Sequence, residues 1–168
     1  KYEHSGGPGF KILAEVIRTH CAVPAKDLNE LLKRILFNLI IGNDDAHGKN
    51  FSLVYSDHND TNLSPAYDLV CTQAYPDLDR TMAMFIGGKN TLESLTPDSL
   101  HQLADDMGIK IKPLAKGLLQ FCDKALASLE EVISDLDDCY TEDYKVLLSI
   151  VRIAKLNHGK VCDLLKGL

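Results

Sequence analysis

Residues 27–42 read DLNELLKRILFNLIIG, the most regular apolar pattern in the chain. Apolar side chains recur along it at the spacing i, i+3, i+4, i+7, which is typical of a helix with one buried face. A glycine then supplies a C-terminal stop, because glycine readily adopts the left-handed backbone conformation found at helix ends. We therefore predict a core helix over residues 27–41 that ends at Gly42.

Weaker patterns on both sides of this helix predict a mainly α fold with a small β region. Extended segments are expected at 51–55 and 81–86, a turn at 57–62 and an extended or irregular segment at 63–72. Further helices are expected over 10–21, from Thr96 to Gly108, over 118–136 and over 144–156. A chain of 168 residues can bury one sizeable core, so we expect a single domain over residues 1–168.

The composition narrows the class of protein. Lys and Arg number 18 against 24 Asp and Glu, which gives a net charge of −6 and argues against a broad nucleic-acid-binding face. The longest apolar run, at 35–41, is far shorter than the roughly 20 residues that cross a bilayer. Five cysteines without a CxxC pair favour reduced thiols and no metal knuckle. We expect a cytoplasmic protein that contacts no membrane and binds no nucleic acid directly.

Polar residues follow the core helix directly, in the segment GNDDAHGKN at 42–50. Taken alone, such a segment is often only a turn. Asp45 and Asn50, however, have the D-x-x-x-x-N spacing of a protein-kinase catalytic loop, in which Asp accepts the substrate hydroxyl proton and Asn binds magnesium. Asp68, 18 residues further on, is in a suitable place for a second metal-binding carboxylate. The sequence therefore predicts a site for phosphoryl transfer.

Three segments together carry a family resemblance: KYEHSGGPG at 1–9, GNDDAHGKNFS at 42–52 and SPAYDLV at 64–70. With these motifs in this order, the chain resembles the C-terminal lobe of the HipA-type serine/threonine kinases, the toxins of bacterial HipBA-like toxin–antitoxin modules. The resemblance implies a kinase-like helical lobe that uses ATP and Mg²⁺. It also implies that Asp45 is catalytic, that Asn50 binds magnesium and phosphate, and that Asp68 binds the metal.

Two further residues of the motif have open roles. Lys49 could contact the γ-phosphate as a point charge, or it could brace the loop against Asp44. For His47 we favour a ring that is hydrogen-bonded to the backbone and holds the loop, rather than a group that transfers protons, because the neighbouring Asp45 already fills that role. Both residues are candidates for the ATP-binding site.

The resemblance also implies parts that this chain lacks. In HipA-like kinases the lysine that pairs with the nucleotide phosphates, the covering loop and the regulatory serine lie upstream, and the glycines at 6–9 do not replace them, since Pro8 has no N–H to donate. We therefore expect an N-terminal kinase lobe or subunit as a partner, and little activity from this chain alone. The family further suggests a protein substrate, such as an aminoacyl-tRNA synthetase, and a HipB-like antitoxin.

Two other functions deserve comparison. The chain could be a non-catalytic helical module that binds an antitoxin or a partner subunit and keeps the motif for structure. It could also be a metal-dependent phosphohydrolase that uses Asp45, His47 and Asp68, although further ligands at close spacing are missing. Asp57 and His58 are expected to lie in a solvated turn.

Overall fold

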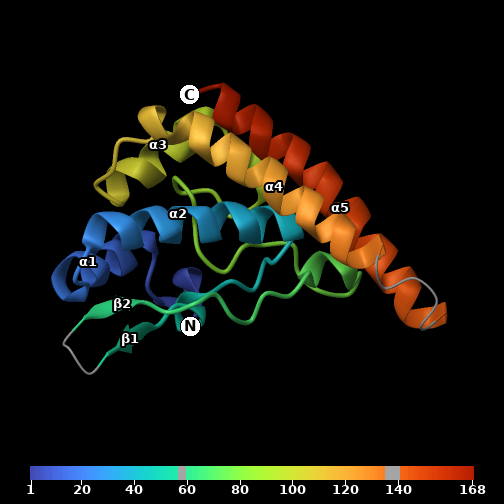
Figure 1. Ribbon diagram of the computed structural model, residues 1–168, viewed down its shortest axis with the longest axis horizontal. Coiled ribbons are helices and arrows are strands. Elements are labelled where there is room, and N and C mark those ends of the chain that lie inside the picture. Colours follow the sequence, from blue (N-terminus) through green and yellow to red (C-terminus); the bar gives the residue numbers. More distant parts are fainter. Residues whose placement is uncertain (57–59, 135–140) are drawn as a thin grey trace.

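The fold is mainly helical, as predicted (Figure 1). The computed structural model describes residues 1–56, 60–134 and 141–168. Two short antiparallel strands accompany the helices, and the chain between them and α3 is irregular apart from single 3₁₀ turns. The helices are α1 (Phe10–His20), α2 (Pro24–Ile41), α3 (Pro97–Asp106), α4 (Ala115–Ser134) and α5 (Thr141–Lys166), and the strands are β1 (Leu53–Tyr55) and β2 (Thr61–Leu63).

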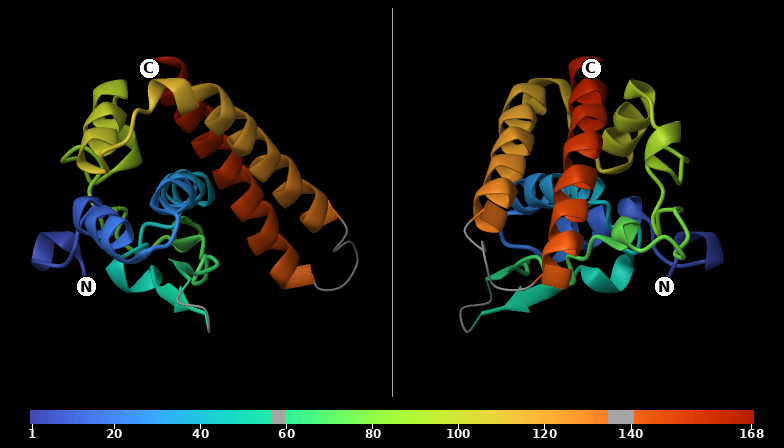
Figure 2. Two further views of the ribbon diagram at one scale, coloured as in Figure 1. Left: turned by 60° about the vertical axis from the view of Figure 1, so that its left-hand side comes forward. Right: turned by 90° about the vertical axis from the view of Figure 1, so that its right-hand side faces the viewer.

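Helix α2 lies at the centre of the molecule and packs against α1, α4 and α5. Helices α4 and α5 run side by side across one side of α2, and the two strands lie on the other (Figures 1 and 2). The apolar face that the sequence predicts is buried, with the side chains of Leu31, Leu32 and Leu36 completely inaccessible to solvent. Burial of this stripe on several sides fixes the position of the helix end, and thus of the polar loop that follows.

The C-terminus of α2 is also as predicted. Gly42 has φ = 70° and ψ = 43°, and its N–H bonds to the carbonyl of Leu39. A side chain at this position would be strained, and its Cβ would lie 2.9 Å from atoms of the Gln73 side chain. The helix begins three residues earlier than expected, at Pro24, a residue that is well tolerated in a first helical turn.

The β region differs from the prediction in part. Residues 53–55 form β1, but its partner is β2, whose first two residues we expected in a turn; Leu53 pairs with Leu63 and Tyr55 with Thr61. The strand expected at 81–86 is wrong, since only an isolated bridge between Ile86 and Lys89 forms there.

The backbone of 81–86 is instead hydrogen-bonded to loops. The N–H of Ala83 donates to the carbonyl of Asp44 at 2.8 Å, and the N–H of Phe85 donates to the Glu3 carboxylate at 2.6 Å. Long-range partners satisfy these groups, so no strand ladder is needed.

The C-terminal helices form where they are expected, but α5 begins three residues before the predicted start at 144 and continues ten residues beyond the predicted end at 156. Thr96 caps α3, with its side chain accepting from the N–H of Ser99, and Gly108 follows the helix in a left-handed conformation. The last two residues of the helix predicted over 118–136, Asp135 and Leu136, lie outside the described residues. No helix in the described part of the chain is long and apolar enough to cross a bilayer.

We predict that Leu36→Ala lowers the free energy of unfolding by about 2–5 kcal/mol, because it leaves a cavity beneath the centre of α2. Leu156→Ala is the matched control, since this side chain on α5 is 62% exposed and its loss should change stability by less than about 0.5 kcal/mol. Urea denaturation of both variants measures the difference. Equal effects would contradict the central role of α2.

Candidate functional site

Hydrogen bonds from the backbone of the polar loop after α2 to Thr72 and Gln73 hold this loop in place. The N–H of Asp44 donates to the Thr72 hydroxyl at 2.8 Å, and that hydroxyl donates to the carbonyl of Gly42 at 3.1 Å. The N–H of Gln73 also donates to the Gly42 carbonyl, at 3.1 Å. These bonds dock the loop after α2 against a second loop, which runs through residues 64–74.

This docking brings Asn50 and Asp68 into direct contact. The side-chain amide of Asn50 donates to Oδ2 of Asp68, while its Oδ1 accepts the N–H of His47 at 2.9 Å. Asp68 has φ = 56°, in the left-handed region, where Asp is one of the few residues other than glycine that occur readily. The two residues that the sequence predicts as metal ligands therefore lie together, although they come from separate loops.

A buried asparagine joins α2 to both loops. The side-chain amide of Asn43 donates to Oδ1 of Asn38, on α2, at 3.0 Å and to the backbone carbonyl of Asp68 at 3.1 Å. On the other side, the guanidinium of Arg34 donates to the carbonyl of Ser64. Polar side chains within the core helix thus position the backbone on which Asp68 is mounted.

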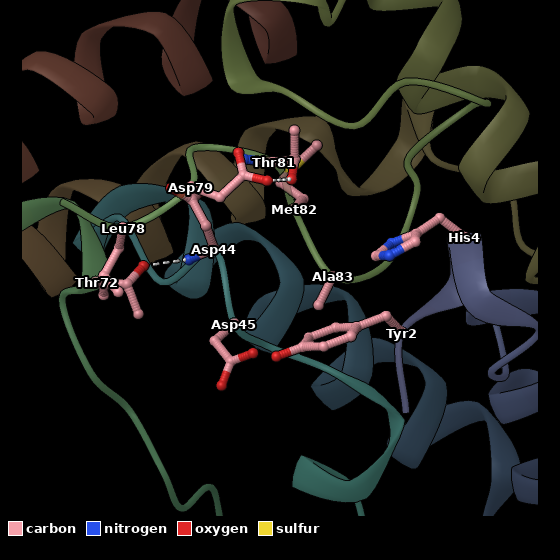
Figure 3. A pocket seen from close by; sticks show the side chains of 10 residues that line it. All are labelled: Tyr2, His4, Asp44, Asp45, Thr72, Leu78, Asp79, Thr81, Met82 and Ala83. Carbon is pink, nitrogen blue, oxygen red and sulfur yellow. Dashed lines mark hydrogen bonds between the residues drawn. The ribbon is translucent and has the colours of Figure 1, made fainter.

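Asp45 lies at the edge of an open cavity of about 370 Å³ (Figure 3). Its side chain is 45% exposed, and its Oδ2 lies 3.6 Å from Nζ of Lys1 and 4.0 Å from Nε2 of His47. A carboxylate in this position can be reached by a hydroxyl group from outside the protein. The cavity is lined by Tyr2, His4, Asp44, Asp45, Thr72, Leu78, Asp79, Thr81, Met82 and Ala83.

The structure changes the role expected for His47. Its ring is buried and meets the Tyr2 ring edge-on, with ring centres 5.8 Å apart. The ring faces the backbone of Asn50 in a capping-box arrangement, as expected for a loop-holding role, but within the described part of the chain its buried Nδ1 has no partner at hydrogen-bond distance. The backbone of His47 holds the loop instead, because its N–H binds the Asn50 side chain and its carbonyl accepts the Asn50 N–H at 2.9 Å.

Lys49 is exposed, and its carbonyl accepts the Tyr67 hydroxyl at 2.7 Å. Of the two roles considered for Lys49, bracing against Asp44 is not seen, since across residues 1–56, 60–134 and 141–168 Asp44 forms no ion pair. The Asp44 carboxylate is held by an amide instead.

That amide belongs to Gln73, whose Nε2 lies 3.1 and 3.0 Å from the two Asp44 oxygens. Asn157 on α5 in turn donates to Oε1 of Gln73 at 3.0 Å. Burial raises the pKa of the Asp44 carboxyl to about 6, although the hydrogen bonds from Gln73 favour its ionised form. Helix α5 therefore reaches the site through two neutral amides.

Several residues around the site are not predicted by the sequence. Tyr2 and His4 lie in a segment that contributes to the family resemblance, but its sequence gives neither residue a role in the site, and Thr72, Gln73 and Asn157 carry no motif. Nothing in a single sequence distinguishes these polar residues from those on the surface. Asp57 and His58, which we expected in a solvated turn, lie outside the described residues.

The geometry also bears on a metal-dependent hydrolase. Among the described residues, the ligand atoms of Asp45, His47 and Asp68 do not gather within 4.8 Å of one another. A three-ligand metal site built from these residues is therefore not formed.

Comparison with known proteins identifies the family. The family model of the HipA-like C-terminal domain matches residues 1–136, which include both loops of the site. The chain belongs to the HipA-like C-terminal domain family. This result confirms the resemblance drawn from the three sequence segments.

Other members of the HipA-like family extend the comparison. A Sinorhizobium fredii protein named as a kinase, Y4mE, is 38% identical over 146 residues, which are 87% of this chain and 34% of the relative. The serine/threonine-protein kinase toxin HipA of Shewanella oneidensis is 31% identical over 113 residues, 67% of this chain and 26% of that protein. The chain thus spans about a quarter to a third of the length of these curated relatives.

A solved structure shares the HipA-like fold. It is a complex of Shewanella oneidensis HipA with HipB and operator DNA, and it matches with a TM-score of 0.80 and 25% sequence identity. The match covers 94% of this chain and 38% of the other chain. The fold of this chain is therefore that of the corresponding part of a HipA protein.

We predict that Asp44→Asn changes the pH dependence of stability. Between about pH 4 and 6 the folded chain keeps a proton on Asp44 that the unfolded chain has released, so this carboxyl makes folding less favourable as the pH rises. Relative to the unmodified chain, the free energy of unfolding of Asp44→Asn should therefore increase from about pH 4 to pH 7, by up to about 3 kcal/mol. Urea denaturation at each pH measures this difference.

The control is Asp60→Asn, which removes an exposed carboxylate. The difference in free energy of unfolding between Asp60→Asn and the unmodified chain should stay nearly constant from about pH 4 to pH 7. If the difference in free energy of unfolding between Asp44→Asn and the unmodified chain is also constant with pH, burial does not raise the pKa of the Asp44 carboxyl.

Proposed function

We propose that this chain is the C-terminal catalytic lobe of a HipA-type serine/threonine protein kinase, which transfers the γ-phosphate of ATP to a protein hydroxyl. The observation that carries the proposal is the contact between Asn50 and Asp68. These residues are 18 positions apart and come from different loops, yet their side chains meet, and Asn50 belongs to the loop that bears Asp45. A D-x-x-x-x-N segment that served only as a turn would not require this convergence.

The donor set suits Mg²⁺, which prefers oxygen ligands and retains several waters. Asn50 Oδ1 accepts one hydrogen bond, from His47, and so keeps a second lone pair, while Oδ1 of Asp68 has no hydrogen bond within the described residues. In our proposal these two oxygens hold the ion. When bound, the ion would neutralise charge on the phosphate oxygens of ATP.

Asp45 is suited to orient the attacking hydroxyl. In our proposal its exposed carboxylate accepts the hydrogen bond of a serine or threonine hydroxyl at the mouth of the cavity, and receives the proton as phosphoryl transfer proceeds. Lys49 is exposed beside Asn50 and remains a candidate for contact with the γ-phosphate. His47 supports Asn50 through its backbone, so we propose an indirect role for it in cofactor binding.

The remaining parts of the kinase are also proposals. ATP needs further contacts, and we infer that an N-terminal lobe of the longer protein supplies them. Since the Shewanella HipA structure contains HipB, a HipB-like antitoxin is the partner that we propose here. An aminoacyl-tRNA synthetase as substrate and a toxin role follow from the resemblance, and a cytoplasmic location follows from the composition; all three remain predictions.

We predict that Mn²⁺, as a paramagnetic substitute for Mg²⁺, binds this chain at Asn50 and Asp68. The amide NMR signals of these residues should broaden first during a titration, and Asp68→Asn should weaken binding at least about tenfold because it removes the only charged ligand. Asp60→Asn should leave the affinity unchanged. Broadening that does not depend on Asp68 would contradict the metal site.

We predict that Asp45 is essential for phosphoryl transfer. In a chimera that carries this chain in place of the matching segment of Shewanella HipA, transfer of label from ATP to protein should fall about 10²–10⁴-fold in Asp45→Asn, since the general base is lost. Asp60→Asn in the same chimera should remain active. Equal activity of the Asp45 variant and the parent chimera would refute the assignment.

The same chimera separates the kinase from a non-catalytic interaction module. A module would bind HipB without transferring phosphate, whether or not Asp45 is present. A kinase lobe transfers phosphate and loses this activity with Asp45.

A further inference from the structure

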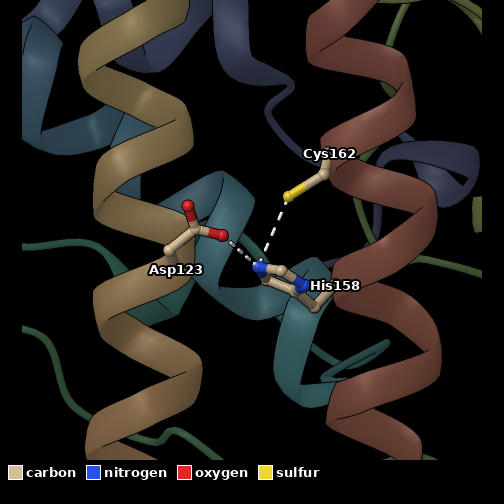
Figure 4. Close-up of side chains that lie close together, drawn as sticks. All are labelled: Asp123, His158 and Cys162. Atoms are coloured by element: carbon tan, nitrogen blue, oxygen red, sulfur yellow. Dashed lines mark hydrogen bonds and ion pairs between the residues drawn. The ribbon is translucent and has the colours of Figure 1, made fainter.

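A second cluster of metal-binding residue types lies between α4 and α5, apart from the proposed kinase site (Figure 4). Nε2 of His158 lies 2.9 Å from Oδ1 of Asp123 and 3.3 Å from Sγ of Cys162. All three ligand atoms lie within 4.8 Å of one another. His158 and Cys162 are on α5, and Asp123 is on the facing side of α4.

The backbone brings these groups together. His158 and Cys162 are four residues apart on α5, so their side chains project from the same face of the helix. Asp123 approaches from the neighbouring helix, and α4 and α5 pack along their length. Cys162 is only 6% exposed, whereas the Asp123 side chain is 66% exposed. The cluster is thus anchored on its inner side and open to solvent on its outer side.

A nucleophilic relay does not fit this geometry. In a Cys–His–Asp relay the carboxylate holds one ring nitrogen while the other nitrogen faces the nucleophile. Here Asp123 and Cys162 both approach the same atom, Nε2 of His158. One ring nitrogen cannot accept a proton from the thiol and donate a proton to the carboxylate at the same time. A cation placed between the three groups would interact favourably with all of them.

We propose that Asp123, His158 and Cys162 bind a Zn²⁺ ion that links α4 to α5. A thiolate, an imidazole and a carboxylate are characteristic zinc ligands, and three protein ligands leave the fourth tetrahedral position for water. Ligand atoms around tetrahedral zinc are about 3.4–3.6 Å apart, as follows from the usual bond lengths. The two separations from Nε2 of His158 need to widen by about 0.3–0.5 Å. The carboxylate of Asp123 must also come to about 3.6 Å from Sγ of Cys162, which lies within 4.8 Å of it, and the exposed Asp123 side chain permits both movements.

Binding has a defined proton balance. Cys162 loses its thiol proton to solvent as the S–Zn bond forms, and His158 binds through its neutral Nε2. No oxidant or reductant is involved. The site is also distinct from the family motif, because the HipA-like family model ends at residue 136, before two of the three ligands.

The four-residue spacing of His158 and Cys162 is visible in the sequence, but the absence of a CxxC pair led us to expect no metal knuckle. The third ligand, 35 residues before His158, could not have been found by spacing. Only the packing of α4 on α5 places it there.

Co²⁺ provides the test, because its complexes with thiolates absorb light. The reduced chain, freed of metal by a chelator, should bind one Co²⁺ with thiolate-to-metal charge transfer in the near-ultraviolet and the intense visible bands of tetrahedral cobalt, and added Zn²⁺ should displace it. Cys162→Ser should abolish the charge-transfer band. Cys21→Ser, a buried thiol after α1, is the matched control and should retain it.

Two variants guard against simple misfolding of Cys162→Ser. His158→Gln and Asp123→Asn change more exposed positions, and each should weaken Co²⁺ binding at least about tenfold and remove the rise in melting temperature that Zn²⁺ gives to the parent chain. Asp163→Asn is the control, since Asp163 is an exposed carboxylate on α5 outside the cluster. This variant should bind Co²⁺ as the parent chain does and should keep the rise in melting temperature that Zn²⁺ gives. Absence of charge transfer in the parent chain, or its persistence in Cys162→Ser, would overturn the proposal.

Discussion

The side-chain amide of Asn43 is the contact on which the candidate kinase site depends. Its two N–H groups bind Asn38 of α2 and the backbone carbonyl of Asp68. One buried side chain therefore joins the core helix, the loop that carries Asp45 and the loop that carries Asp68. Leaving a buried hydrogen-bonding group without its partner typically costs about 1–3 kcal/mol. Arrangements that break either hydrogen bond of Asn43 are therefore disfavoured.

Helix α2 makes that junction rigid. Its apolar stripe is buried against α1, α4 and α5, and its left-handed C-terminal residue directs the chain straight into the polar loop. The site is thus mounted on the least mobile kind of element, a helix packed on several sides. The proposed metal-binding atoms of Asn50 and Asp68 need no long side chains to meet, because the backbone has already brought them together.

The site contains a group that opposes stability. Asp44 is buried, and two neutral amides in succession, those of Gln73 and Asn157, support it rather than a cation. Its raised pKa shows that the surrounding protein disfavours the charge. Helix α5 thereby supports the candidate kinase site through Asn157. The next residue, His158, belongs to the separate cluster with Asp123 and Cys162. Asn157, His158 and Cys162 lie beyond the residues that the family model matches.

The sequence alone determined the core helix, its glycine stop and the capped start of α3 at Thr96, because each depends on residues a few positions apart. The strand expected at 81–86 failed for the opposite reason: its N–H groups bond to distant partners, Asp44 and Glu3. The cavity, the amide support of Asp44 and the cluster between α4 and α5 were likewise decided by tertiary structure. The residues that form each of these features come from segments far apart in the sequence, and the spacing of residues along one sequence does not predict contacts between such segments.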